Sequence, residues 1–339
     1  MAVRLKRLEG QVIVLTGASS GIGLTTARMA AKRGARLVLA ARNEEALSAL
    51  TEEIRNAGGQ AVFVVADVGN EDDVQKIAKI AEDRFGGFDT WINNAGGGIF
   101  GRILDISTED HRRLFETNFW GVVYGSKAAV RGLMQRGGAL INVGSVVSDR
   151  AVPLQGMYSA TKHAVKGFTD ALRMELEAAG APISVTLIKP TSIDTPFAQH
   201  ARNYMAEEPT LPPPVYTPNL VAEAILHCAE TPRRDVIVGG GGKMLSVLGL
   251  RAPWLADRVM ASGSFLRLEK TDHPPLHPSG ALYEPTFGLR ERGEYEGHVR
   301  GTSVYTQATL HPLATGALAL GAGLLLGLLA TQRTPDSHS

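Results

Sequence analysis

A glycine-rich turn near the N-terminus constrains the fold more than any other feature of this chain. The segment at 16–23, TGASSGIG, follows an apolar run at 12–15 and opens a helical pattern at 24–33. Glycines permit a tight turn and let backbone N–H groups approach a pyrophosphate at a helix N-terminus. The spacing is G-x-x-x-G-x-G, for which an ordinary glycine-rich turn is the alternative. Its strand–turn–helix context favours a dinucleotide-binding site.

Apolar runs and helical patterns alternate along the first 240 residues. The apolar runs are nearly continuous, which is typical of strands buried on both faces of a parallel sheet. Helical patterns at 44–56, 71–85, 159–179 and 219–230 separate them. This alternation predicts an α/β fold, a doubly wound parallel sheet with helices on both faces. The predicted strands lie at 12–15, 37–40, 62–65, 91–92, 140–143, 185–188 and 236–238.

Composition and charge exclude several functional classes. With 44% apolar and 20% charged residues the chain is typical of a globular protein, and its net charge of +1 gives no electrostatic case for nucleic acid. Cys228 is the only cysteine, so no disulfide can form within the chain. The histidines are scattered, and Asp272, His273 and His277 lie in a proline-containing stretch, so we expect no metal site. Ser145 has no paired histidine, which argues against a hydrolase triad.

Tyr158 and Lys162 form the pattern that bears most directly on chemistry. Four residues apart, they lie on one face of a helix about one turn from each other. An ammonium beside a phenol favours the phenolate, so Lys162 is expected to lower the Tyr158 pKa from its usual value near ~10. Ser145 follows the apolar run 139–143, at the carboxyl end of a predicted strand. Enzymes built on parallel sheets place their chemistry at that edge.

These two motifs together resemble the short-chain dehydrogenase/reductase family, over roughly the first 240 residues. The resemblance implies a Rossmann-type sheet of about seven strands in one continuous catalytic domain. One departure is that the family usually has Pro-Gly after the sixth strand, whereas this chain has Pro190-Thr191. The resemblance implies that a nicotinamide cofactor is held by Gly17, Ser19, Ser20, Gly21, Ile22, Gly23, Arg42, Asp67, Val68, Asn94, Ala95, Gly96, Tyr158, Lys162, Pro190, Ile193 and Thr195.

The catalytic roles follow from hydride chemistry together with the resemblance. When hydride adds to a carbonyl carbon, charge grows on the oxygen and a proton must arrive there, which Tyr158 is expected to supply. Ser145 is expected to donate a hydrogen bond to the carbonyl oxygen. Lys162 is expected to act on Tyr158 and to bind the nicotinamide ribose. By resemblance Asn118 anchors a water in a proton relay, with a helix-packing amide as the alternative.

The end of the second predicted strand indicates which cofactor is used. A carboxylate there would bind the ribose 2′-OH and repel a 2′-phosphate, but Ala41 and Arg42 offer none. The fork-shaped cation of Arg42 suits phosphate, and Ser19 and Ser20 can add hydroxyl contacts. We therefore expect NADP(H) to be preferred over NAD(H). The alternative for Arg42 is a solvated residue paired with a nearby glutamate.

The C-terminal third extends beyond the family pattern. We divide the chain into a catalytic domain at 1–240, a helical extension at 241–270, a Pro/Gly-rich linker or arm at 271–312, and a candidate transmembrane tail anchor at 313–330. The last segment holds eighteen residues without charge or proline. As a helix it spans about 27 Å, close to the ~30 Å of a hydrocarbon core. The alternative is a Gly/Ala-rich helix buried in an oligomer interface.

These observations predict a membrane-anchored, NADP(H)-dependent oxidoreductase that interconverts a carbonyl and an alcohol, with its catalytic domain in the cytoplasm. An anchored site suits an apolar substrate, and the loop 192–218 has the length of a substrate lid or of an irregular connection. By analogy with the family, a homo-oligomer is expected. The alternatives are a soluble cytoplasmic dehydrogenase of a small polar alcohol or sugar, and a non-catalytic NADP(H)-binding sensor.

Overall fold

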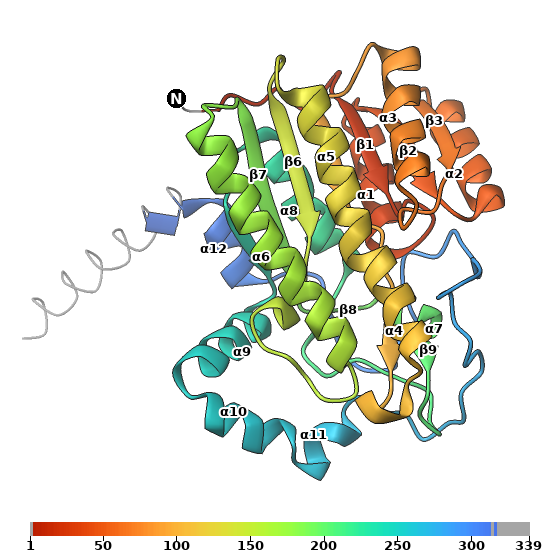
Figure 1. Cartoon of the computed structure of the whole chain (residues 1–339), viewed down its shortest axis with the longest axis vertical. Helices are drawn as coiled ribbons and strands as arrows, with labels where there is room; N and C mark the ends of the chain where they lie inside the picture. Colours follow the sequence, from red (N-terminus) through yellow and green to blue (C-terminus); the bar gives the residue numbers. More distant parts are fainter. Residues whose placement is uncertain (1–2, 313–314, 317–339) are drawn as a thin grey trace, which may run out of the picture.

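A seven-stranded parallel sheet forms the centre of the molecule (Figure 1). The computed structural model describes residues 3–312 and 315–316. The strand order is β11-β7-β6-β4-β1-β2-β3, so the chain reverses direction across the sheet between β1 and β4. This confirms the predicted doubly wound α/β fold. The strands are β1 (Val12–Thr16), β2 (Arg36–Ala41), β3 (Gln60–Val65), β4 (Thr90–Asn93), β6 (Gly138–Val143), β7 (Ile183–Pro190) and β11 (Asp235–Val238).

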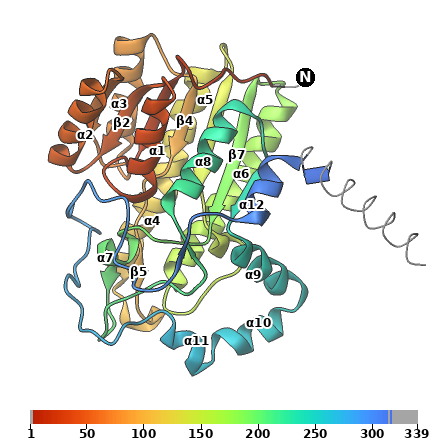
Figure 2. The ribbon, with the colours of Figure 1, turned by 180° about the vertical axis from the view of Figure 1, so that it is seen from behind.

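Helices cover both faces of the sheet, as Figure 1 and the reverse view in Figure 2 show. Alternate residues of one strand enter opposite cores: Ile13 and Leu15 pack with one set of helices, and Val12 and Val14 with the other. The first set is α1 (Gly21–Lys32), α2 (Glu44–Asn56) and α8 (Pro218–Glu230). The second set is α3 (Glu71–Phe85), α5 (Gly121–Leu133) and α6 (Gly156–Ala178).

Short elements connect these layers near the carboxyl ends of the strands. Asn118 lies in a π-helical turn, η2, which joins α4 to α5 without a break. The loop predicted at 192–218 contains short strands and one turn of helix. The remaining elements of this region are β5 (Ile99–Phe100), η1 (Ile103–Asp105), α4 (Thr108–Phe115), η2 (Glu116–Trp120), η3 (Val146–Ser148), β8 (Ser192–Ile193), α7 (Phe197–His200), β9 (Arg202–Asn203) and β10 (Val215–Tyr216).

The segment expected as a helical extension forms three helices. Pro253 begins the second and Gly263 the third, so the chain bends at each, and Figure 1 shows the three beyond one end of the sheet. Residues 271–303, which we call the arm, are irregular except for β12. The next helix returns to the body, where Leu310 is buried in the main core. These elements are α9 (Gly240–Arg251), α10 (Pro253–Met260), α11 (Gly263–Arg267), β12 (Val299–Arg300) and α12 (Val304–Leu310).

The tail anchor predicted at 313–330 lies outside the described residues, apart from 315–316. Among the helices within 3–312, none is both long and apolar enough to cross a membrane.

Candidate functional site

Two adjoining cavities lie at the carboxyl ends of the central strands. The first, which we call the apolar cavity, has a volume of about 370 Å³ and contains Ser145, Tyr158 and Lys162. Its other walls are mainly apolar side chains from the 192–218 loop and from α9 to α11. The second, the glycine-rich cleft, measures about 210 Å³. The side chains of Thr195 and Phe197 line both cavities, so the two spaces meet there.

The glycine-rich turn packs so closely against its neighbours that a side chain at Gly17 or Gly23 would clash with them. Gly17 has φ +70, and a Cβ atom there would lie 2.8 Å from the Cα of Ala95. At Gly23 a Cβ would lie 2.0 Å from the carbonyl oxygen of Gly17. Asn94 Nδ2 donates to the carbonyl oxygens of Thr16 and Gly17 at 3.0 and 3.2 Å, which fixes the turn against the end of β4. The glycines are therefore required for the close packing of this turn, which lies at the N-terminus of α1, where backbone N–H groups favour an anion such as a pyrophosphate.

Arg42 lines the glycine-rich cleft, but the arm binds its guanidinium. Nη1 donates to the carbonyl oxygen of Tyr283 at 2.7 Å and to that of Leu282 at 3.3 Å, and Nη2 donates to that of Ala281. Burial lowers the pKa of Arg42, and the charge of Arg113 acts in the same direction. Arg113 itself pairs with Asp67 at the same edge of the cleft. The alternative of Arg42 as a solvated residue paired with a glutamate does not match this geometry.

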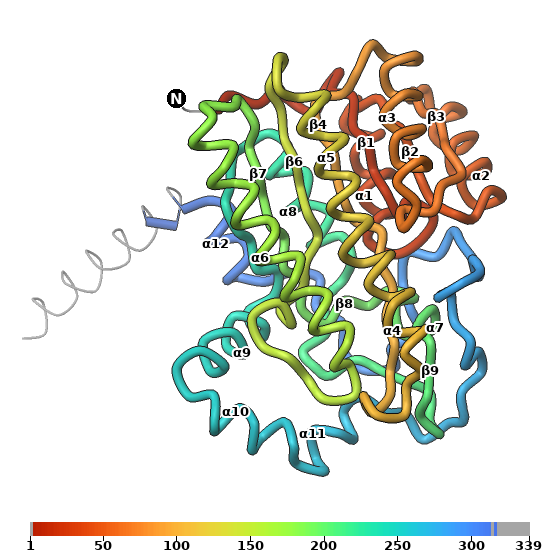
Figure 3. Tube along the Cα trace, viewed as in Figure 1, coloured from red at the N-terminus to blue at the C-terminus, as the bar shows by residue number. Residues whose placement is uncertain are grey.

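The arm lies across the glycine-rich cleft and was not expected there. The N–H of Leu289 donates to Ser19 O at 2.8 Å, and the N–H of Gly21 donates to Arg290 O at 2.9 Å. Arg28 forms an ion pair with Glu291 at 2.8 Å. In the Cα trace of Figure 3 this segment runs as a long, irregular blue tube along the outside of the molecule. Because it has neither helical nor strand periodicity, no sequence pattern predicted its path.

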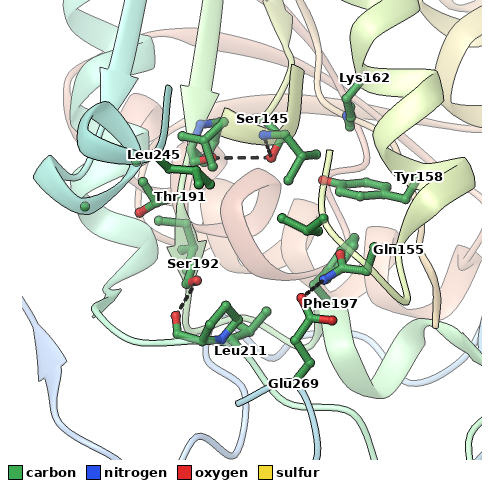
Figure 4. A pocket seen from close by; sticks show the side chains of 18 of the residues that line it. Ser145, Gln155, Tyr158, Lys162, Thr191, Ser192, Phe197, Leu211, Leu245 and Glu269 are labelled. Atoms are coloured by element: carbon green, nitrogen blue, oxygen red, sulfur yellow. Dashed lines mark hydrogen bonds between the residues drawn. The ribbon is translucent and has the colours of Figure 1, made fainter. Parts of the chain in front are cut away.

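Tyr158 points its hydroxyl into the apolar cavity, toward Ser145 (Figure 4). Ser145 follows β6 and begins the turn η3, where its Oγ accepts from the N–H of Val147 at 3.3 Å and lies 3.5 Å from Pro190 O. Burial raises the pKa of Tyr158 to about 12, and the Ser145 hydroxyl opposes this shift. Tyr158 therefore keeps its proton through the neutral range.

Lys162 is buried behind Tyr158, and its Nζ donates to the carbonyl oxygen of Val143 at 2.9 Å. Burial lowers the pKa of Lys162 to about 8. The structure thus differs from the expected lowering of the Tyr158 pKa by a charged neighbour. The helical spacing places the two groups together as expected, but desolvation shifts both pKa values toward the neutral forms.

Asn118 is held by the backbone of the loop after β4. Its Nδ2 donates to Gly97 O at 3.0 Å and to Thr161 Oγ1 at 3.2 Å, and its Oδ1 accepts from Gly97 N at 2.8 Å. Thr161 precedes Lys162, so Asn118 fixes the helix that carries Tyr158 and Lys162. These contacts match the packing alternative, and the water-relay role remains a prediction.

Most of the predicted site residues gather around the two cavities; Asn118 and Gly21 line neither. Ser145, Tyr158, Lys162, Pro190 and Ile193 line the apolar cavity. Ile22, Asn94, Gly96 and Thr195 line both, and the remaining predicted residues line the cleft alone, namely Gly17, Ser19, Ser20, Gly23, Arg42, Asp67, Val68 and Ala95. The sequence reasoning missed Gln155, Phe197 and Glu269, which also line the apolar cavity. Gln155 stands three residues before Tyr158, and this closeness in sequence was the one signal that could have placed it at the site.

Comparisons with known proteins agree with this arrangement. Residues 11–206 match the family model of short chain dehydrogenases. The oxidoreductase YxnA of Bacillus subtilis is 48% identical over 324 residues, which cover 94% of this chain and 90% of that protein.

Two solved structures share the fold. A short chain dehydrogenase/reductase from Burkholderia phymatum in complex with NAD superposes with a TM-score of 0.67 at 26% identity, covering 74% of this chain and 96% of that one. An alcohol dehydrogenase from Thermococcus sibiricus complexed with 5-hydroxy-NADP superposes with a TM-score of 0.60 at 29% identity, covering 68% and 96%.

Proposed function

The chain belongs to the short-chain dehydrogenase family, and from this premise we propose that it interconverts an apolar carbonyl compound and its alcohol, using NADP(H). The observation that carries the proposal is that Tyr158, Ser145 and Lys162 share one wall of a cavity whose other walls are mainly apolar. An apolar cavity of about 370 Å³ favours a substrate with little charge.

In the direction of reduction, Tyr158 is the proton donor. Its pKa of about 12 keeps it protonated at neutral pH, and its hydroxyl points into the cavity toward Ser145. Ser145 donates a hydrogen bond to the carbonyl oxygen of the substrate, and this bond holds the oxygen within reach of the Tyr158 hydroxyl. Lys162, with a pKa near 8, can restore the proton to Tyr158 because it exchanges protons close to neutral pH. The nicotinamide cofactor supplies or accepts the hydride when bound.

The glycine-rich cleft is the proposed cofactor site. Backbone groups of Gly17 to Gly23 would hold the pyrophosphate, and Asp67 and Val68 would contact the adenine ring. We propose NADP(H) over NAD(H) because Arg42 stands at the cleft and no carboxylate follows β2 within residues 41–43. Asn94, Gly96, Pro190, Ile193 and Thr195 would surround the nicotinamide where the two cavities meet.

The test measures oxidation of NADPH and of NADH by the full chain in mild detergent. The carbonyl panel runs from small sugars and polar aldehydes to bulky cyclic and long-chain ketones. We expect turnover that increases with substrate apolarity and is faster with NADPH. Turnover confined to small polar carbonyls would overturn the proposed substrate class. Tight NADPH binding without turnover of any carbonyl would favour the sensor alternative instead.

A homo-oligomer remains part of the proposal. Trp120 and Met174 are exposed on the side of the molecule formed by α5 and α6, with exposed fractions of 41% and 58%. A second copy that packs on this face would bury both side chains.

A further inference from the structure

Glu269 brings a carboxyl group into the apolar cavity. It follows α11 and is fully buried, and Figure 4 shows its side chain rising toward Gln155 on the side of the cavity away from Lys162. Its Oε1 accepts from Gln155 Nε2 at 3.3 Å. Its Oε2 has no hydrogen-bond partner among residues 3–312. A buried polar atom without a partner costs stability, so its retention in a cavity wall needs an explanation.

The backbone holds Glu269 in this position. The N–H of Thr210 donates to Glu269 O at 3.0 Å, and a bridge between Pro209 and Lys270 extends this pairing. Gln155 is fixed as well, because it precedes α6 and its carbonyl accepts from the N–H of Ser159 at 2.8 Å. The Glu269 carboxyl is therefore held in place by the backbone and by Gln155, and its Oε2 is the one oxygen of that carboxyl without a hydrogen-bond partner among residues 3–312.

Within the part of the chain that the structure describes, Glu269 has no counter-charge beside it. Its neighbour Lys270 pairs with Glu207 at 3.0 Å, and the only cation among the described residues that line the apolar cavity is Lys162, which donates to Val143. The wall of the apolar cavity also includes apolar side chains such as Met260 and Phe265. Burial raises the pKa of Glu269 to about 8, so the group is mostly a neutral acid at pH 7. A neutral carboxylic acid can donate a hydrogen bond to an oxygen of the substrate. A cationic group on the substrate would instead require Glu269 to be ionised.

We propose that Glu269 determines specificity by binding a second oxygen function of the substrate, a hydroxyl or a carbonyl, remote from the carbonyl that reacts beside Tyr158. This rests on the proposed function and narrows its substrate class to apolar hydroxyketones and diketones. In the absence of that partner Oε2 stays unsatisfied, so a substrate lacking the second oxygen binds less well.

The experiment compares matched substrates in the wild type, Glu269→Leu and Glu269→Gln, with Met260→Leu as a control in the same cavity wall. Each pair is an apolar ketone with and without a remote hydroxyl or keto group. We expect the wild type to prefer the oxygenated member, mainly through KM, and Glu269→Leu to lose about 10-fold or more of that preference. Glu269→Gln should keep part of it, and Met260→Leu all of it. An equal preference in the wild type and Glu269→Leu would overturn the proposal.

A binding measurement separates this proposal from the proposed function. Ligand-induced melting shifts are recorded with the oxygenated and plain members of each pair, in the presence of NADP⁺. A larger shift for the oxygenated member in the wild type, lost in Glu269→Leu, supports the role of Glu269 even if no carbonyl is turned over. Turnover of ketones without any such difference contradicts the role while the proposed function stands. A preference for amines over hydroxyls would also contradict it.

Discussion

The Nζ atom of Lys162 lies 5.7 Å from the centroid of the Tyr158 ring, one turn further along α6. Both groups are withdrawn from solvent, so each favours its neutral form: the pKa of the phenol rises to about 12 and that of the amine falls to about 8. Tyr158 therefore keeps its proton at neutral pH, whereas Lys162 loses its extra proton near pH 8. Two predictions depend on this pair.

Tyr158→Phe should lower kcat by roughly 100-fold to 10,000-fold, because it removes the proposed proton donor and leaves the ring in place. NADPH binding, followed by fluorescence titration, should change little. Tyr204→Phe is the matched control: its hydroxyl donates to Asp110 at 2.8 Å and it lines neither cavity. If Tyr158→Phe keeps the wild-type kcat, Tyr158 is not the proton donor.

Lys162→Met should stabilise the folded protein below pH 8 by on the order of 3 kcal/mol, because the pKa of Lys162 falls from 10.5 to about 8 on folding. Below pH 8 the wild-type lysine is charged in both states, and burying that charge is unfavourable. Between about pH 8 and 10.5 only the unfolded state keeps the proton, so wild-type stability rises with pH relative to the variant and the difference closes. Denaturant unfolding across this range measures it. Curves for the wild type and the variant that run parallel from pH 7 to 10.5 would contradict the lowered pKa of Lys162.

Arg42→Ala should raise KM for NADPH about 10-fold and leave KM for NADH nearly unchanged, if Arg42 binds the 2′-phosphate. Arg28→Ala is the control for the arm, since Arg28 holds it through Glu291. If Arg42 serves only to hold the arm through the 281–283 carbonyls, Arg42→Ala should weaken both cofactors equally, as Arg28→Ala does. That result would remove the argument for NADP(H).

Removal of the residues after 312 tests the predicted membrane anchor. The cut must follow α12, because Leu310 is buried and its carbonyl accepts from Arg233 Nη2 at 2.8 Å. We expect the full chain to bind lipid vesicles and the shortened chain to stay in solution, with equal kcat/KM toward a water-soluble ketone. Vesicle flotation and steady-state kinetics measure this. If neither form binds vesicles and only the full chain forms oligomers, the tail belongs to an assembly instead.

The strands and the glycine-rich turn were predictable because local pattern determines them. Buried parallel strands leave continuous apolar runs, and positions such as Gly23 tolerate no Cβ. Ser145, Tyr158 and Lys162 could be grouped in advance because they follow one strand and begin the next helix. Pro253 and Gly263 are visible in the sequence as signals that break the extension into separate helices.

Other parts of the site depend on tertiary structure that no short pattern encodes. Glu269 reaches the apolar cavity only because α9 to α11 lie beyond the end of the sheet at which that cavity opens. The arm reaches Arg42 through backbone carbonyls, which carry no side-chain signature. The pKa values of Tyr158 and Lys162 depend on how much of the chain covers them. For Tyr158 this burial outweighs the effect of Lys162, from which a lowered pKa was expected.

The arm also affects how this protein can be recombined with its relatives. One continuous segment contributes Glu269 to the apolar cavity and then covers the glycine-rich cleft from residue 281 onward. A chimera that exchanges the chain after residue 240 therefore exchanges part of the wall of the apolar cavity together with the segment that covers the glycine-rich cleft. Substrate range and cofactor affinity should then be inherited as one trait, and a crossover between Thr271 and Ala281 is the place to separate them.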